Sequence, residues 1–165
     1  MEKKLFRCYK LNKWNYITLS VYLLLSFFLL TFFLLNKFDR KQVLFFYTFG
    51  TQFFIYGGQY RALRNFYYFL IWLTIGIIHF SLFLSLRNDP ELAFVNGHAS
   101  LGLRSTIISL LLYQFLRFIS LTIQKKELVV PAKYGKYDLL DERKVTFLDY
   151  ICFFTFFGLT LYFMV

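Results

Sequence analysis

A stripe of polar side chains interrupts one of the long apolar runs of the sequence. It comprises Ser105, Ser109, Tyr113 and Arg117, which recur at every fourth position. This spacing places all of them on one face of a helix. A polar stripe on an apolar helix faces protein or water rather than lipid. It predicts either a path for a substrate or an ion, or hydrogen bonding between helices, and we favour the hydrogen bonding.

Two opposite charges stand at matching depths in the last two apolar runs. Arg117 lies about six residues before the end of its run, and Asp149 lies about four residues after the start of the next. A lone charge within a hydrocarbon layer costs several kcal/mol, so pairing would be favourable. We therefore predict an ion pair between the two side chains. The alternative is that Arg117 extends to the membrane surface and Asp149 lies among the lipid head groups.

Histidine is the residue type here that best suits a cofactor. His79 lies within an apolar run, where it could ligate haem or relay a proton. A haem in a membrane anchor usually needs a second axial ligand, and His98 lies in a predicted loop. We therefore expect a packed, hydrogen-bonded His79, and we predict no resident cofactor and no metal. The alternative is a haem or a quinone at His79 and Arg104, where Arg104 begins the following run.

Motifs of soluble enzymes are missing from the sequence. It contains no GxGxxG, no P-loop, no GxSxG and no HExxH. Of its 165 residues, 58% are hydrophobic, 24% are aromatic and 17% are charged. A soluble domain carries nearer a quarter charged residues and fewer aromatic ones. The composition predicts a membrane protein, and we expect that it is not an enzyme.

Five apolar runs must position these side chains. They cover residues 14–35, 43–58, 66–86, 101–123 and 145–165. A run of about 20 apolar residues crosses a membrane as a helix, because lipid offers no partner to backbone N–H and C=O groups. We predict an all-α polytopic membrane protein with five transmembrane helices. Residues 14–165 form a single transmembrane domain, and residues 1–13 form a basic amphipathic tail.

The second run, residues 43–58, is short, and Gln52 stands near its centre beside Gly50 and Thr51. Such sequence is typical of the broken helices of transporters. The distribution of Lys and Arg favours a full crossing: with five spans, 13 lie on one side and 4 on the other. Without that crossing the two sides carry 6 and 11. Because basic residues accumulate on the inner side, we predict an inner N-terminus and an outer C-terminus.

The net charge of +10 comes mostly from residues that flank the apolar runs. The basic residues of the tail are Lys3, Lys4, Arg7, Lys10 and Lys13. Interleaved with apolar side chains, they suit an anionic lipid surface, such as one that contains cardiolipin. Because topology accounts for the charge, we expect no nucleic-acid partner. Cys8 lies in the tail and Cys152 in the last run, so we expect no disulfide.

Short loops and abundant Phe and Leu favour a membrane-embedded accessory subunit of a larger complex, with other membrane subunits as its partners. The many Phe, Tyr, Ile, Asn and Lys residues have AT-rich codons, which suggests an organellar gene. We therefore expect the mitochondrial inner membrane, with a respiratory-chain or ATP-synthase complex as host, and a bacterial inner membrane as the alternative. A small oligomeric transporter or channel is the second hypothesis. A quinone- or haem-binding membrane anchor is the third.

Overall fold

All five apolar runs are mostly helical in the computed structural model. The structure describes residues 10–35, 39–95, 97–132, 137–140 and 143–164. Its α-helices are α1 (Lys13–Leu34), α2 (Arg40–Phe53), α3 (Phe66–Leu86), α4 (Leu101–Ile123) and α5 (Phe147–Met164). The predicted runs 66–86 and 101–123 coincide with α3 and α4. The prediction of a helical protein is therefore confirmed.

Within the described residues, four helices are long and apolar enough to cross a membrane, judged by length and composition: α1, α3, α4 and α5. The helix α2 is shorter, with 14 residues, but it continues directly into the π-helix η1 (Phe54–Gly58). The two together cover residues 40–58. This helix therefore begins three residues before the predicted run 43–58 and ends with it.

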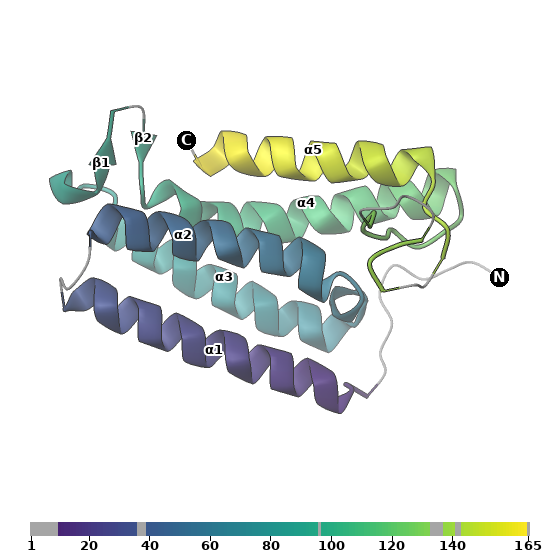
Figure 1. Ribbon diagram of the computed structural model, residues 1–165, viewed down its shortest axis with the longest axis horizontal. Helices are drawn as coiled ribbons and strands as arrows, with labels where there is room; N and C mark the ends of the chain where they lie inside the picture. The colour runs from purple at the N-terminus through teal and green to yellow at the C-terminus, as the bar shows by residue number, and fades with distance from the viewer. Residues whose placement is uncertain (1–9, 36–38, 96, 133–136, 141–142, 165) are drawn as a thin grey trace.

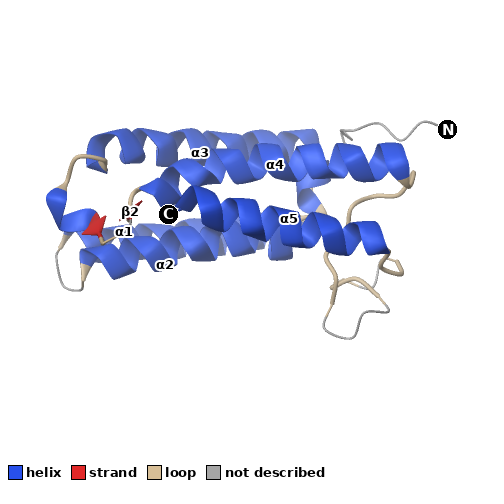
Figure 2. Cartoon of the chain, turned by 90° about the horizontal axis from the view of Figure 1, so that it is seen from above, coloured by secondary structure: helices blue, strands red, loops and turns tan. Residues whose placement is uncertain are grey.

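The helices lie side by side along the long axis of the molecule, and successive helices run in opposite directions (Figures 1 and 2). At the centre, α4 packs against α2, α3 and α5, while α1 packs against α2. We call one end of the bundle the hairpin end. It holds η3 (Pro90–Leu92), β1 (Ala93–Phe94) and β2 (Gly97–His98), which pair as a short antiparallel hairpin. The opposite, loop end holds η2 (Ala62–Arg64) and residues 124–132.

Side chains at the helix starts satisfy backbone N–H groups that have no partner within the helix. Asp39 and Asn65 each accept a hydrogen bond from the backbone N–H two residues further on, at 3.0 and 2.9 Å. At α5 the Asp149 carboxylate accepts from the backbone N–H of Thr146 at 2.8 Å. This is one half of a capping box, with Thr146 before the helix and Asp149 three residues later. Each such cap contributes about 1 kcal/mol, so the helix starts are well defined.

Aromatic side chains fill the space between the helices. Tyr56 of η1 stacks on Phe156 of α5, with ring centroids 4.2 Å apart. Trp72 of α3 lies against Tyr22 of α1, with centroids at 4.7 Å. Tyr56, Trp72 and Phe156 are 0% exposed. Ring contacts of this kind stabilise the packing beyond the area they bury, and here they join helices that are distant in sequence.

Two glycines allow other helices to approach α4 closely. A Cβ atom at Gly102 would lie 2.2 Å from Thr48 Oγ1 and 2.6 Å from Thr48 Cβ, both on α2. A Cβ atom at Gly76 of α3 would lie 2.9 Å from Ile107 Cγ1 of α4. Small residues at contacts between apolar helices permit this close packing. The position of α2 against α4 therefore depends on Gly102.

Candidate functional site

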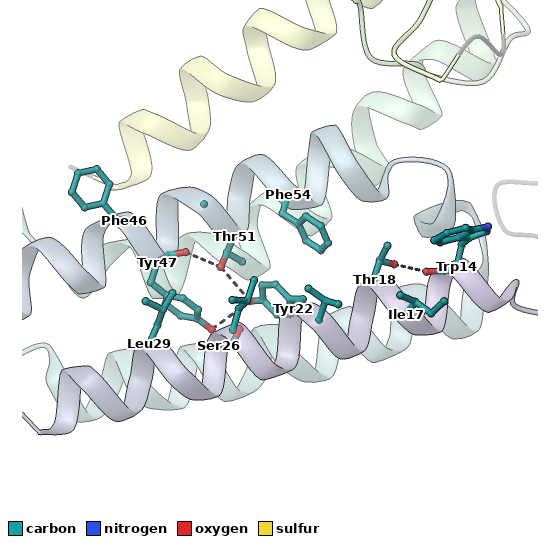
Figure 3. Close-up of a pocket in the computed structure, with 13 residues that line it drawn as sticks. Trp14, Ile17, Thr18, Tyr22, Ser26, Leu29, Phe46, Tyr47, Thr51 and Phe54 are labelled. Atoms are coloured by element: carbon teal, nitrogen blue, oxygen red, sulfur yellow. Dashed lines mark hydrogen bonds between the residues drawn. The ribbon is translucent and has the colours of Figure 1, made fainter.

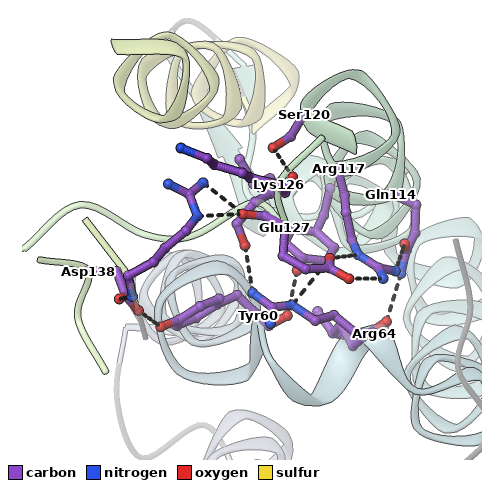
Figure 4. A network of polar contacts seen from close by, with 12 residues as sticks. Tyr60, Arg64, Gln114, Arg117, Ser120, Lys126, Glu127 and Asp138 are labelled. Atoms are coloured by element: carbon purple, nitrogen blue, oxygen red, sulfur yellow. Dashed lines mark hydrogen bonds and ion pairs between the residues drawn. The ribbon is translucent and has the colours of Figure 1, made fainter. Parts of the chain in front are cut away.

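A buried cluster of charged side chains occupies the loop end of the bundle (Figure 4). The Arg117 guanidinium contacts both carboxylate oxygens of Glu127, with Nε at 2.8 Å and Nη2 at 3.2 Å. Arg64 approaches the same carboxylate, with its Nε 3.6 Å from Oε2. Arg117 is 0% exposed, and Arg64 and Glu127 are 6% exposed. A bidentate arginine–carboxylate contact fixes the geometry of both groups, so this cluster is rigid.

The return of the chain after α4 brings Glu127 back to Arg117. The helix ends at Ile123, and Lys125 then adopts a left-handed backbone conformation with φ 53°. A residue in this conformation just after a helix turns the chain back on itself. Leu128 and Val129 follow and are buried in the core, and Arg64 Nη2 donates to the Leu128 carbonyl at 2.8 Å. Glu127 is therefore held by its neighbours as well as by its charge.

Asp149 belongs to a second ion pair at the same end. Its Oδ1 lies 2.7 Å from Arg143 Nη2 and accepts from Gln124 Nε2 at 3.3 Å, and its Oδ2 accepts from the Thr146 hydroxyl at 2.7 Å. Arg143 also donates to the Glu127 carbonyl at 2.7 Å, which links the two pairs through the backbone. Asp149 is 0% exposed, so its charge depends on these contacts.

The predicted ion pair between Arg117 and Asp149 is wrong, although both side chains lie at the loop end. Arg117 pairs with Glu127, and Asp149 pairs with Arg143. The reason is that the segment after α4 folds back onto the bundle and supplies a nearer partner for each charge. The alternative, that Arg117 extends to the surface, is also wrong, because its side chain is 0% exposed.

The polar stripe of α4 lies against protein along its whole length. Ser109 Oγ and Thr160 Oγ1 of α5 are 3.3 Å apart, and the Tyr113 hydroxyl donates to the Tyr60 carbonyl. Ser105 Oγ accepts from Gln52 Nε2 at 2.9 Å. All four stripe residues, with Arg117 as the last, are 0% exposed. These contacts tie α4 to α2, to α5 and to the turn after η1.

A second polar network crosses the middle of the bundle, and we call it the polar seam. The Tyr47 hydroxyl and His79 Nε2 are 2.7 Å apart, and His79 Nδ1 is 3.0 Å from Thr106 Oγ1. Gln52 Nε2 donates to Thr106 Oγ1 at 3.3 Å. Tyr22 of α1 joins the seam at the Tyr47 hydroxyl, at 3.4 Å. Both ring nitrogens of His79 are engaged, so ligation of haem iron there would require one of these bonds to break.

The remaining predicted residues that the structure describes make none of the hydrogen bonds of these two networks. Arg104 is half-buried near the hairpin end, with its guanidinium carbon 5.6 Å from the centre of the Phe83 ring. Lys10 and Lys13 are exposed beside the start of α1. Cys152 is a buried free thiol. The other residues of the tail and its cysteine, namely Lys3, Lys4, Arg7 and Cys8, lie outside the described residues.

A groove of about 380 Å³ lies between α1 and the helix formed by α2 and η1 (Figure 3). Its walls are mostly apolar, and the hydroxyls of Tyr22, Tyr47 and Thr51 gather on its floor. Tyr22 Oη lies 3.2 Å from Thr51 Oγ1. The groove therefore touches the polar seam through Tyr22 and Tyr47, and it is open along α1. It is lined by Trp14, Ile17, Thr18, Val21, Tyr22, Leu25, Ser26, Leu29, Phe46, Tyr47, Gly50, Thr51 and Phe54.

Sequence reasoning missed Glu127, Arg64 and Arg143, which all come from segments predicted as loops. The loops on one predicted side of the membrane carry opposite charges. These charges predict no particular ion pair, because pairing depends on how the loops fold. The position of Asp149 at a helix start was easier to predict from the sequence. Thr146 three residues before Asp149 matches the pattern of a capping box, which predicts that Asp149 lies at the start of α5.

The fold and these sites define a helical bundle with four helices that can cross a membrane and with polar networks at its loop end and its middle. Comparisons of the chain with protein-family models, with curated protein sequences and with solved structures give no match.

Proposed function

We propose that the chain is an integral membrane protein that crosses the bilayer five times, with its N-terminus inside and its C-terminus outside. Residues 40–58 are the crossing that this proposal adds to the four long helices. At about 1.5 Å per residue they measure about 28 Å, close to the hydrocarbon thickness of about 30 Å. Their ends lie at opposite ends of the bundle, which supports a full crossing (Figure 1).

The charge distribution supports the orientation. The segments 1–13, 57–65 and 124–144 hold 13 Lys and Arg residues, against 4 in the segments 36–42 and 87–100. Basic residues retained on the inner side would place the loop end inside. The buried ion pairs of Arg117 and Asp149 would then lie at the inner membrane surface.

Reporters fused to the two termini test whether the number of crossings is odd, and they test the orientation. An odd number of crossings places the termini on opposite sides. We expect a fluorescent protein that folds only inside to fluoresce at the N-terminus, and a phosphatase active only outside to work at the C-terminus. Each reporter exchanged to the other end serves as the control and should be inactive. Termini on the same side would contradict five crossings.

We further propose that the protein is a membrane-embedded structural subunit of a larger complex. The main support for this proposal is the polar interior of the bundle. There, side chains of the central helices form hydrogen bonds with another helix or with a folded loop. Gln52 bonds from α2 to α4, Ser109 contacts Thr160 of α5, and Gln114 Nε2 donates to the Leu63 carbonyl at 2.9 Å. Hydrogen bonds between membrane helices contribute about 0.6 kcal/mol each, and breaking a buried ion pair costs about 3–5 kcal/mol.

This interior favours a scaffold over a transporter. A protein that opens a path through its bundle must break contacts of this kind in every cycle, whereas a scaffold gains rigidity from them. The Phe- and Tyr-rich composition supports an AT-rich genome, so we propose the inner membrane of an organelle, with a bacterial inner membrane as the alternative. The host complex would be a respiratory-chain or ATP-synthase complex.

Purification of the tagged chain from its native membrane in mild detergent tests the structural role. We expect the 20.0 kDa chain to migrate on a native gel in a much larger species, with the same membrane proteins in repeated preparations. An unrelated helical membrane protein with the same tag serves as the control for non-specific capture. A single species of the size of the chain, with undiminished thermal stability, would contradict the proposal.

A further inference from the structure

The packing of the helices leaves a groove open between α1 and α2. Its volume of about 380 Å³ falls within the range of about 300–1,000 Å³ that is typical of small-molecule sites. Aromatic rings form much of its wall at one end, where Tyr22 and Phe54 lie parallel with ring centroids 5.6 Å apart. Aliphatic side chains such as Leu25 and Leu29 continue the wall along α1. The groove therefore suits a ligand with a flat ring and an apolar tail.

The Ser26 hydroxyl in the groove is only weakly paired within the described residues. Ser26 is 8% exposed and lines the groove, and its hydroxyl makes no hydrogen bond of ordinary geometry within the described residues, with the nearby Tyr47 hydroxyl as a weak partner. Thr18 and Thr31 on the same helix behave differently, because each donates to the carbonyl four residues earlier, at 2.9 and 2.7 Å. A buried hydroxyl with poor hydrogen bonding costs up to about 1–3 kcal/mol. A ligand with an acceptor oxygen at Ser26 would remove this cost.

The depth of Ser26 limits the charge of the ligand. Ser26 lies 13 residues after Lys13, the first residue of α1, and hence about 20 Å along the helix. A charged lipid head group at this depth of a bilayer would cost several kcal/mol, and no residue that lines the groove is charged. An acyl chain would fit the apolar walls but offers no acceptor to Ser26. The ligand must therefore be neutral, soluble in lipid and able to accept a hydrogen bond.

We propose that this groove binds a molecule of the quinone class. A ring carbonyl accepts a hydrogen bond from Ser26, the ring lies against the aromatic wall at Tyr22, and the apolar tail follows α1. The proposal concerns binding alone. It is independent of whether the chain belongs to a larger complex, because the groove is formed within the chain.

Gly50 provides a sharp test, because it lines the groove and a Cβ atom there meets nothing within 4 Å. Gly50→Leu should fill the groove without disturbing the bundle. Gly158→Leu on α5 is the matched control, since Gly158 is also exposed and has open space around it. The full chain is reconstituted in phosphatidylcholine vesicles and titrated with a benzoquinone that carries a ten-carbon tail. Saturable quenching of the fluorescence of the two Trp residues reports binding.

We expect saturable binding to the unaltered chain and to Gly158→Leu, and at least tenfold weaker binding to Gly50→Leu. Val21→Phe is a second groove-filling variant, with the same expected loss. Ser26→Ala should weaken binding about fivefold, as expected for one hydrogen bond, whereas Ser81→Ala, at an exposed serine of α3, should not. Thermal unfolding without the probe confirms that each variant is folded.

Two results would overturn the proposal. Equal quenching of the unaltered chain and of both groove-filling variants would show that the probe acts only from the bilayer. Equally strong displacement of the quinone by decylbenzene, which has the same tail but no carbonyl, would show that the groove takes hydrocarbon chains only.

Discussion

Replacing Glu127 with glutamine is expected to lower the free energy of unfolding by about 3–5 kcal/mol. Glutamine has the same size and can still accept a hydrogen bond, so the change isolates the charge. It removes the carboxylate that contacts the buried Arg117 at 2.8 Å and Arg64 at 3.6 Å. A buried charge that loses its counter-charge is far more costly than an exposed one, because water cannot replace the lost interaction. Thermal unfolding in detergent should show a midpoint lowered by about 10 °C.

Glu91→Gln is the matched control for this change. Glu91 also pairs with an arginine, Arg40, but its side chain is 66% exposed. Pairs exposed to water contribute about 0–1 kcal/mol, so this substitution should have little effect. The double variant Glu127→Gln with Arg117→Met should recover part of the loss, because it removes the buried cation as well. Equal small losses at Glu127 and Glu91 would show that the charge cluster at the loop end does not stabilise the fold.

Gly102→Ala is expected to destabilise the protein by about 1–3 kcal/mol or more, although alanine is the better helix former. Its Cβ atom would lie 2.2 Å from Thr48 Oγ1 and 2.6 Å from Thr48 Cβ, so α2 must move away from α4. That movement would also weaken the hydrogen bonds of Gln52 to Ser105 and Thr106. Thermal unfolding should detect a lowered midpoint.

Gly158→Ala should shift the midpoint in the opposite direction. A Cβ atom at Gly158 has nothing within 4 Å, so the variant gains helix propensity of up to about 1 kcal/mol without a clash. Thr48→Gly in the Gly102→Ala background removes the side chain that causes the clash and should restore part of the stability. If Gly102→Ala and Gly158→Ala stabilised the protein equally, the close contact of α2 with α4 would be refuted.

Much of the helical layout was predictable because hydrophobicity and helix length are local properties. The runs 66–86 and 101–123 match α3 and α4 at both ends. Asn65 caps α3, and breakers such as Pro90 and Gly97 separate α3 from α4. The polar stripe from Ser105 to Arg117 was also local information, since a spacing of four residues fixes one helix face. These features depend on neighbours in the sequence and on no distant contact.

Partners of the polar residues were much less predictable. Arg117 was expected to meet Asp149, and it meets Glu127, which the chain brings back through the left-handed turn at Lys125. A non-glycine residue in this conformation is uncommon, so the sequence offers little warning of the turn. His79 was expected to be hydrogen-bonded, but its partner Tyr47 could not be chosen among 13 tyrosines without knowing which side chains of α2 reach α3.

The groove that we assign to a quinone is a property of the tertiary structure alone. It lies between α1 and α2, and its lining includes Tyr22 and Thr51, whose hydroxyls join the two helices. The sequence by itself determined five helical runs, a polar stripe and an uneven distribution of charge, because each follows from periodicity and composition along the chain. Only the tertiary structure decided which charges pair, how weakly the Ser26 hydroxyl is paired, and how closely α2 approaches α4. Those outcomes depend on contacts between residues that are far apart in the sequence.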